Sequence, residues 1–270
     1  MIERDILLNE MKLRGFSRQT MKAYVYWNHA ILSWIRKSPK EVAQKDIESY
    51  LLFLHKKGLE PSSRHNAVAA LRFYYSEVLR RKFRWVYPKK KRHLPIVISK
   101  EHVLAMIEST KNIKHRLLLE LLYGSGVRVG EAVKMKSSDI NASDGTGIIR
   151  EGKGGNDRMI IVSKRFLEDF HAFNNERTDT SLYLFPSNHG NPHISKRTAE
   201  MVVKQAAKRA GVKGRIFPHA LRSSFATHLI DNGTPLPHIQ RLLGHSHIKT
   251  TLSYIRVSKR NLKGVESPLD

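Results

Sequence analysis

Apolar side chains recur every three or four residues through the first 85 positions, which places them on one face of an α-helix. The pattern predicts four helical segments, with Ser17 as the N-cap of the second and Ser38-Pro39 as its end. The third segment runs from Gln44 to about Lys57, and Pro61 opens the fourth. The apolar positions that define the segments include Ile6, Leu7, Met11, Tyr24, Trp27, Ile31, Trp34, Ile35, Val68, Leu71, Tyr75, Val78 and Leu79. Four short helices of this kind predict a small bundle.

The pattern changes after residue 85. A segment at 86–98 contains four consecutive cationic side chains between two prolines, which predicts a linker because like charges at close spacing resist packing. Further on, the sequence predicts helices at 100–110, 112–123 and 127–135, a β-hairpin at 147–150 and 159–162, and helices again after about 195. The predicted fold is mainly α with a small β-sheet (α+β). Its parts are a four-helix domain at 1–85, the basic linker at 86–98, a mixed α/β domain at 99–258 and a tail at 259–270.

The charge of the chain indicates what it binds. There are 48 lysines and arginines against 24 acidic residues, a formal net charge of +24 at pH 7. Both parts share the excess, since residues 1–94 hold 21 basic and 8 acidic side chains and residues 95–270 hold 27 and 16. Such a charge predicts a polyanionic partner, most commonly nucleic acid. A merely basic surface, as in ribosomal or thermophile proteins, is the alternative.

Other features of the composition exclude whole classes of site. The chain has no cysteine, which excludes disulfides, thiolate zinc sites, iron–sulfur clusters and a cysteine nucleophile. No stretch approaches the ~18 consecutive apolar residues that a membrane helix needs. The charged start of the chain lacks the apolar core of a signal peptide. We therefore expect a soluble cytoplasmic protein, associated with the nucleoid if it binds DNA, and no membrane partner.

A set of polar residues in the second domain is suited to phosphate chemistry. Its members are Arg128, Lys153, His219, Arg222, His245 and Tyr254. His219 and Arg222 are three residues apart on a predicted helix and so share one face. Arg128 stands at a predicted helix start, where free backbone N–H groups also favour anions. Taken alone, each of these residues is more often an ordinary surface or packing residue, so the order and local context of the whole set carry the argument.

That order resembles the tyrosine recombinase (integrase) family. The matching contexts are Gly-x-Arg-x-x-Glu, Gly-Lys-Gly in a hairpin turn, His-x-Leu-Arg-x-Ser-Phe-Ala-Thr-His-Leu, and Leu-Gly-His followed by a tyrosine. They span most of residues 95–260, and the four-helix front resembles the core-binding domain of that family. The compact size and the tail resemble the Xer subgroup, especially its archaeal members.

The resemblance implies a DNA strand transferase that needs neither metal, ATP nor cofactor. Two guanidiniums, those of Arg128 and Arg222, would clamp the charged phosphate oxygens. Tyr254 would be the nucleophile and form a 3′-phosphotyrosyl intermediate. The remaining implied roles are a proton donor to the leaving 5′ oxygen (Lys153), a base that assists the tyrosine (His219) and a hydrogen-bond donor to the scissile phosphate (His245).

Some residues depart from the family pattern or invite another interpretation. Ser223 follows Arg222 where many relatives have histidine, and Arg256 stands where Tyr-x-His is frequent. Neither is a core catalytic position. Glu131 is predicted to orient Arg128 or to support packing. The pair His245 and His247 suggests a metal site, but a spacing of two does not suit a helix and no Asp, Glu or Cys completes the set, so no metal is expected.

DNA contacts are predicted mainly in the first domain. The candidates are Arg64, Arg72 and Arg80 on the fourth helix and Lys89, Lys90 and Lys91 in the linker. For the helix arginines, contacts to DNA and an ordinary solvated face remain alternatives. The aromatic residues Trp27, Trp34, Phe73, Tyr74 and Tyr75 fall at helical spacing, so we expect them in the core rather than stacked on bases. His228 is predicted to pack or to cap a helix.

The resemblance also implies a biological setting. Xer proteins resolve chromosome dimers at a dif-like site during cell division, acting as tetramers in which the C-terminal segment docks on a neighbouring protomer. The expected partners are therefore double-stranded DNA with a specific site and further copies of the chain; the sequence leaves any activating protein open. The alternatives are an integrase or resolvase of a plasmid or virus, a type IB topoisomerase, and a DNA-binding protein without catalysis.

Overall fold

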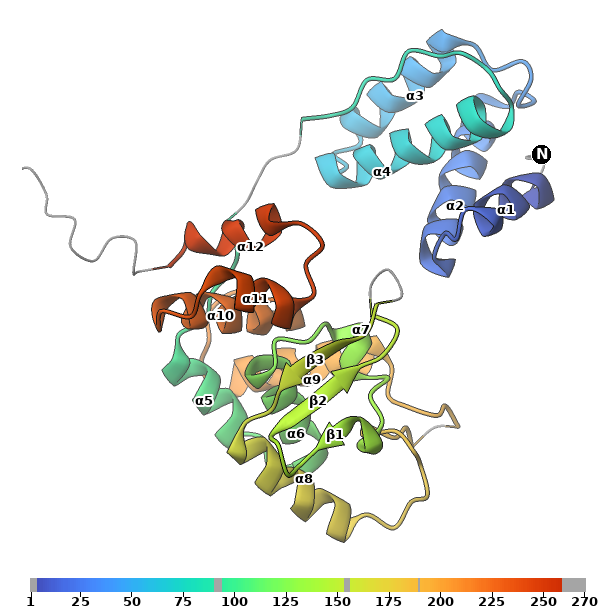
Figure 1. The fold of residues 1–270 in the computed structure, drawn as a ribbon. Coiled ribbons are helices and arrows are strands. Elements are labelled where there is room, and N and C mark those ends of the chain that lie inside the picture. The colour runs from blue at the N-terminus through green and yellow to red at the C-terminus, as the bar shows by residue number, and fades with distance from the viewer. Residues whose placement is uncertain (1–3, 90–93, 153–155, 189, 259–270) are drawn as a thin grey trace, which may run out of the picture. The chain divides into compact units, whose positions relative to one another are not determined.

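The chain divides into two compact units, Met1–His93 and Leu94–Asp270. The computed structural model describes residues 4–89, 94–152, 156–188 and 190–258, drawn in colour in Figure 1. Each unit has its own hydrophobic core and is described by itself. Among the described residues helices dominate both units, and a small sheet lies in the second (Figure 1), so the predicted α+β fold class is confirmed. None of the helices in the described parts of the chain is long and apolar enough to cross a membrane.

The N-terminal unit is the predicted bundle of four helices. They are α1 (Arg4–Leu13), α2 (Arg18–Ile35), α3 (Gln44–Lys56) and α4 (Pro61–Arg72). Ser17 caps α2 as predicted, because its hydroxyl accepts a hydrogen bond from the backbone N–H of Thr20 at 3.2 Å. α2 packs chiefly against α4, and between them Asn28 donates to the carbonyl of Ala70 at 3.1 Å. This buried amide fixes the depth at which the two helices meet.

The fourth helix does not continue as a regular α-helix. After Arg72 it widens into a π-helical segment, Phe73–Val78, which the sequence pattern did not predict. The wide turn directs Phe73, Tyr74 and Tyr75 into the core, where all three are buried as expected. Beyond it, Arg80 has a left-handed backbone with φ of 55°, an uncommon conformation for a residue with a side chain. The chain thus leaves the bundle through a strained segment.

The prediction for the two remaining aromatic residues is partly wrong. Trp27 packs against the core and is partly buried, as expected. Trp34 is instead 40% exposed and stacks on Phe53, with ring centroids 5.2 Å apart. A spacing of seven residues places both rings on the same face of α2, but α3 covers only part of the Trp34 ring.

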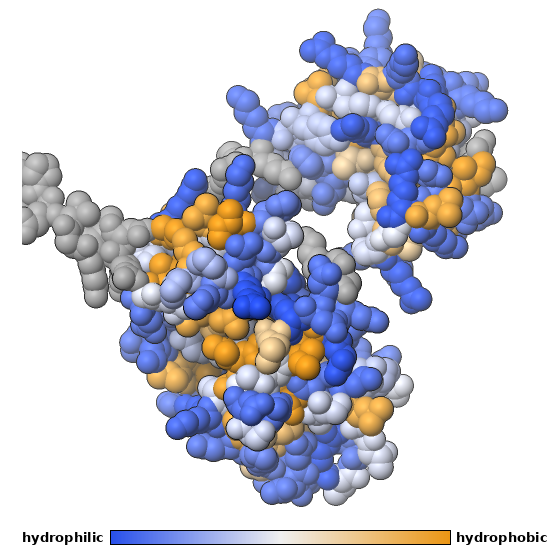
Figure 2. Space-filling view, viewed as in Figure 1, coloured by the Kyte–Doolittle hydropathy of each residue, from blue (hydrophilic) through white to orange (hydrophobic). Residues whose placement is uncertain are grey.

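The C-terminal unit combines helices with a three-stranded antiparallel sheet. Its helices are α5 (Lys100–Glu108), α6 (Ile113–Gly124), α7 (Val129–Ala132), α8 (Lys164–Glu176), α9 (Lys196–Arg209), α10 (Pro218–Asp231), α11 (Leu236–Leu243) and α12 (Ile248–Ile255). The strands are β1 (Ile140–Asn141), preceded by the 3₁₀ turn Ser137–Asp139, then β2 (Thr146–Ile149) and β3 (Arg158–Ile161). β2 pairs with both neighbours, with Ile148 opposite Met159. Figure 2 shows apolar surface over the strands, where three side chains remain partly exposed: Ile148, Met159 and Ile161.

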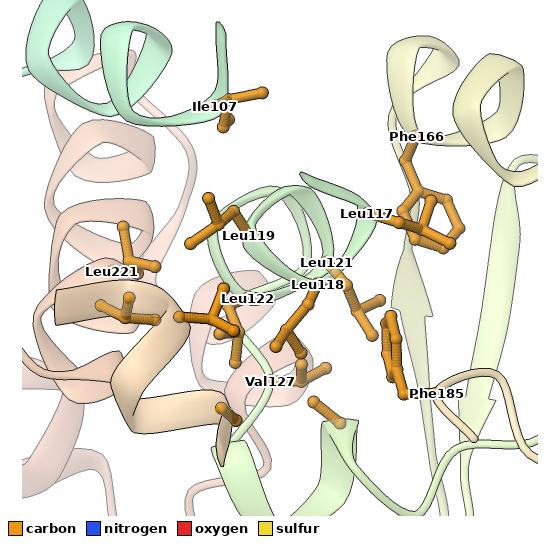
Figure 3. Packing of buried hydrophobic residues seen from close by; sticks show 14 of the residues in the cluster. Ile107, Leu117, Leu118, Leu119, Leu121, Leu122, Val127, Phe166, Phe185 and Leu221 are labelled. Carbon is orange, nitrogen blue, oxygen red and sulfur yellow. The ribbon is translucent and has the colours of Figure 1, made fainter. Parts of the chain in front are cut away.

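Helix α6 lies at the centre of this unit. Leu117, Leu118, Leu121 and Leu122 are fully buried on several sides of it. Figure 3 shows these leucines between Phe166 on one side and Leu221 of α10 on the other. A helix that is apolar nearly all round must be covered on all sides. α6 therefore fixes the positions of α8 and α10, and α10 carries two of the candidate catalytic residues.

Three elements of the C-terminal unit differ from the sequence predictions. The helix expected at 127–135 is a single turn, α7, and the short edge strand β1 was not predicted. α8 was also missed, although its signal is present in the sequence. Ser163 caps it, and Phe166, Phe170 and Phe173 are buried at helical spacing. Ion pairs fasten α8 to α6, among them the 3.0 Å contact of Arg165 with the buried Glu120.

Candidate active site

Arg222 is the buried centre of the site. It lies on α10, and only 2% of the residue is exposed. Its Nη1 donates to the carbonyl of Gly126 and its Nη2 to the carbonyl of Leu243, both at 2.6 Å. Burial and the nearby charge of Arg128 lower the pKa of Arg222 to about 10, which still leaves it protonated at neutral pH. The guanidinium is therefore a fixed positive charge between two loops.

Gly126 makes this approach possible. Its φ is +60°, and a Cβ atom built there would lie 2.3 Å from the ring of Phe225. Any larger residue would push the loop away from α10 and take the carbonyl of residue 126 out of reach of Arg222. Gly126 is thus required by close packing as well as by backbone conformation.

His245 and Tyr254 lie beside Arg222. The imidazole Nε2 is 3.0 Å from Nη2 of Arg222, and Nδ1 is 3.0 Å from the hydroxyl of Thr251. Because arginine only donates, Nε2 is the acceptor and the ring proton sits on Nδ1. The Tyr254 ring stacks on the imidazole with centroids 6.2 Å apart and an angle of 20°, and the residue is 3% exposed. Thr251, one turn before the tyrosine on α12, therefore holds the histidine against it.

Both histidines of the set are biased toward the neutral form. Burial and the charges of Arg222, Arg128 and Arg158 lower the pKa of His245 to about 4. His219 lies one turn before Arg222 and remains accessible to solvent. Partial desolvation and the charges of Arg222 and Arg128 lower the pKa of its imidazole. A neutral imidazole can accept a proton, as a general base must.

Arg128 stands directly before α7 with its side chain 29% exposed. Its Nη1 pairs with Oε1 of Glu131 at 2.8 Å, and its Nη2 donates to the carbonyl of Gly244 at 3.3 Å. The Glu131 carboxylate also accepts from the backbone N–H of Arg128 at 2.9 Å. The predicted orienting contact between Glu131 and Arg128 is therefore present, and part of the guanidinium faces solvent.

Glu131 has a second arginine partner that the sequence analysis missed. Arg158 on β3 donates to both carboxylate oxygens, at 3.0 and 2.6 Å. Burial would raise the pKa of Glu131, but the hydrogen bonds from Arg158 and Arg128 outweigh it and lower the pKa to about 2. The carboxylate is thus ionised at every physiological pH. The only sequence signal for Arg158 is its place at the end of the Gly-rich hairpin turn.

The structure brings together five of the six predicted site residues. Arg128, Arg222, His245 and Tyr254 are joined by contacts through the loop 242–245, and His219 adds its imidazole from the same helix face as Arg222. Lys153 lies outside the described residues. So do two of the predicted DNA-binding lysines, Lys90 and Lys91, and the tail at 259–270.

His245 and His228 both contact other side chains of the protein. Both ring nitrogens of His245 already have protein partners, and the described residues contain no group of three or more histidine, cysteine or acidic side chains suited to a metal ion. His228 packs edge-on against Tyr123, whose hydroxyl lies 2.9 Å from Nδ1. His228 is therefore a packing residue, as predicted.

The predicted DNA-binding residues of the N-terminal unit differ in their surroundings. Arg64 is half-buried and donates to the carbonyl of Leu59 at 3.1 Å, which ties it to the α3–α4 loop. Arg72 and Arg80 are exposed and line a cleft of about 360 Å³. The other cations of this cleft are Arg81 and Lys82, and its walls include Phe83 and Trp85. Lys89 is exposed at the end of the described segment.

Comparison with known families settles the class of protein. Residues 97–261 match the phage integrase family, and residues 4–85 match its N-terminal SAM-like domain. The chain belongs to the phage integrase family. It is therefore a tyrosine recombinase, an enzyme that binds DNA and transfers its strands, as the sequence analysis predicted.

Relatives within this family cover nearly the whole chain. Tyrosine recombinase XerA of Pyrococcus horikoshii is 33% identical over 94% of this chain and 88% of its own length. Tyrosine recombinase XerC of Staphylococcus carnosus is 34% identical over 93% and 91%. The crystal structure of a XerA recombinase matches with a TM-score of 0.58 and 28% identity, covering 96% of this chain and 95% of that one. XerH bound to its palindromic difH substrate has the same fold, with a TM-score of 0.71 at 21% identity over 93% of this chain and 80% of that one.

Proposed function

We propose that this tyrosine recombinase acts at one specific DNA site and joins strands through a 3′-phosphotyrosyl intermediate on Tyr254. The observation that carries the proposal is the contact series Tyr254–His245–Arg222. The phenol lies on α12, the neutral imidazole in the loop before α12 and the buried guanidinium on α10, and the three groups are side by side. A scissile phosphate placed here would meet a nucleophile and compensating positive charge together.

The proposed reaction balances without an external energy source. The phenolic oxygen of Tyr254 attacks phosphorus, a tyrosine–phosphate bond forms at the 3′ end, and the bond from phosphorus to the 5′ oxygen breaks. The phenol proton passes to His219, and Lys153 protonates the departing 5′ oxygen. Arg128 and Arg222 neutralise the non-bridging oxygens. His245 donates a hydrogen bond to one of them from Nε2 once the phosphate has displaced its contact with Arg222 and the ring proton has moved from Nδ1 to Nε2, with the Thr251 hydroxyl then donating to Nδ1. Attack by the 5′ hydroxyl of a partner strand reverses these steps and rejoins the DNA.

The biological role proposed is the resolution of chromosome dimers at a dif-like site, as a cytoplasmic enzyme. Its support is the 33% identity to XerA over 94% of the chain, together with the match in length. We further propose that four copies assemble on two sites, with residues 259–270 docking on the neighbouring protomer. Integration or resolution of a mobile element is the second candidate, supported by a putative integrase/recombinase of Sinorhizobium fredii that is 30% identical over 99% of the chain.

Covalent trapping tests the proposed chemistry. The chain is incubated without metal with duplexes that carry candidate dif-like sites nicked near the cleavage position, so that the released 5′ fragment diffuses away and rejoining fails. We expect a protein–DNA adduct that survives denaturation and, after nuclease digestion, a nucleotide mass on the peptide that contains Tyr254. Adduct on another residue, or none on these duplexes or on mixed genomic DNA despite tight binding, would contradict the proposal. Relaxation of supercoiled DNA without any specific site would instead indicate a topoisomerase.

We also propose that Arg72 and Arg80 hold DNA phosphates in the cleft of the N-terminal unit, with Arg64 and the linker residues Lys89, Lys90 and Lys91 adding further contacts. The support is the clustering of four cations around one cleft, in which Glu77 is the acidic neighbour. The left-handed backbone of Arg80 costs of order 1 kcal/mol.

Replacing Arg80 with glycine should therefore separate stability from binding. We expect the free energy of unfolding to rise by about 0.5–1 kcal/mol, because glycine accepts a positive φ, while DNA affinity falls severalfold and the salt slope of binding drops by about one. Arg36→Gly is the matched control, since Arg36 has the same charge and a φ of 56° at the end of α2 but lies outside the cleft. Denaturant titration and DNA binding between ~50 and ~200 mM salt measure both effects. Equal losses of affinity in the two variants would argue against the cleft.

A further inference from the structure

The loop that carries His245 is held by three arginines from three different elements. Arg158 donates to the carbonyl of Leu242 at 2.9 Å, Arg222 to that of Leu243 at 2.6 Å, and Arg128 to that of Gly244 at 3.3 Å. These are the last carbonyls of α11, which have no partners within the helix and carry its negative dipole end. Three successive acceptors are thus each matched to one guanidinium.

Two of these arginines also share one carboxylate. Glu131 lies between Arg128 and Arg158, pairs with Arg158 through both oxygens, and is 9% exposed. If Arg158 were absent, both oxygens of this ionised carboxylate would be free to bind Arg128. Arg158 therefore limits how strongly Glu131 neutralises Arg128 and leaves part of that guanidinium available to a phosphate.

The path of Arg158 to the loop depends on a glycine. Gly244 has a φ of +61°, and a Cβ atom there would lie 2.8 Å from Cδ of Arg158. The Arg158 side chain is itself only 9% exposed, and its Nε and both Nη atoms have protein acceptors. Three of its five N–H donors are thus held by protein acceptors, and the side chain is almost wholly covered.

We propose that Arg158 is a positioning residue for strand cleavage, acting through Arg128 and the loop that carries His245. It fixes the loop through the Leu242 carbonyl and sets the orientation and effective charge of Arg128 through Glu131. This inference rests on the proposed function, in which Arg128 binds the scissile phosphate. Lysine cannot replace Arg158, because a single ammonium lacks the planar fork of donors that reaches one carboxylate and a carbonyl together.

A double-mutant cycle on adduct formation tests the inference. We expect Arg158→Gln to slow single-turnover adduct formation on the order of 10²-fold, with DNA affinity retained, because a small displacement of catalytic groups has effects of this size. In an Arg128→Lys background the same substitution should cost about tenfold less, because the route through Glu131 and Arg128 is already lost and only the loop contact remains. Arg150→Gln is the matched control: Arg150 follows β2 and pairs with Asp139 at 2.9 Å outside the site. A similar loss in both backgrounds would overturn the proposal and indicate a general structural role.

A second measurement does not depend on activity. Arg158 contributes to the lowered pKa of His245, so Arg158→Gln should raise that pKa in an NMR titration, whereas Arg158→Lys should restore much of the electrostatic effect without restoring cleavage. Full cleavage in Arg158→Lys would overturn the inference. If the wild-type chain forms no adduct, the proposed function fails, and the backbone amide shifts of residues 242–245 in Arg158→Gln still report whether Arg158 holds the loop; unchanged shifts would overturn the inference.

Discussion

Replacing Tyr254 with phenylalanine is expected to abolish the covalent protein–DNA adduct and all strand exchange. The substitution removes only the phenolic oxygen, which is the proposed attacking atom. The ring is buried and stacks on His245, and phenylalanine preserves that packing, so the fold and DNA affinity should be retained. Denaturing gels of the nicked duplex, alongside a DNA-binding titration, measure the two effects separately.

Tyr123→Phe is the matched control for this experiment. Tyr123 packs against the same hydrophobic cluster and its hydroxyl lies 2.9 Å from His228, so the variant also loses a tyrosine hydroxyl from the region. We expect its adduct formation to stay within about tenfold of the wild type, because one ordinary hydrogen bond contributes roughly 0.5–1.5 kcal/mol. Persistent adduct in Tyr254→Phe, or equal loss in both variants, would show that Tyr254 is not the nucleophile.

Arg222→Lys should lower the rate of adduct formation by about 10³-fold, an effect typical of losing a preorganised charge donor to a transition state. The guanidinium donates to the carbonyl of Gly126 from Nη1 and to that of Leu243 from Nη2, and also contacts His245. One lysine ammonium cannot hold both carbonyls and still face a phosphate. Single-turnover cleavage of the nicked duplex at saturating protein measures the loss.

The same substitution should also affect stability, and the two effects can be distinguished. Each buried carbonyl left without a donor costs about 1–3 kcal/mol, so thermal unfolding of Arg222→Lys is expected at a lower temperature. Arg177→Lys is the matched control, because Arg177 makes comparable contacts to Ser137 and to the carbonyl of Ser181 in the same unit. It should lose stability with little change in cleavage. A cleavage loss in Arg222→Lys no larger than in Arg177→Lys would remove Arg222 from the chemistry.

The arginines of the site also affect the pKa of the neighbouring histidines. Burial, together with positive charge from Arg222, Arg128 and Arg158, lowers the pKa of His245 to about 4. When a phosphate dianion in the transition state neutralises these guanidiniums, the penalty on protonating an imidazole falls. The site thus allows a histidine to take up a proton at the moment when negative charge develops on the DNA, which is when the proposed mechanism requires it.

Local patterns in the sequence determined the elements whose signal is complete within a few residues. The Ser17 cap, the apolar face of α2 and the Pro61 start of α4 each follow from side chains that interact within one or two helical turns. The candidate catalytic residues were found for another reason: their order and immediate neighbours match a family, whatever the intervening fold. The missed helix α8 belongs to this class too, since its cap and three phenylalanines were visible in the sequence.

The tertiary structure decided everything that depends on which distant groups meet. The partners of Arg222 lie 96 and 21 residues away, and Arg158 reaches Leu242 across 84 residues. Backbone carbonyls are the acceptors in all three contacts, and every residue has one, so no sequence pattern marks them out. The exposure of Trp34 and the π-helical turn before Arg80 are of the same kind. The sequence therefore determined which residues are candidates for the chemistry, while only long-range packing decided how their charges are shared and held in place.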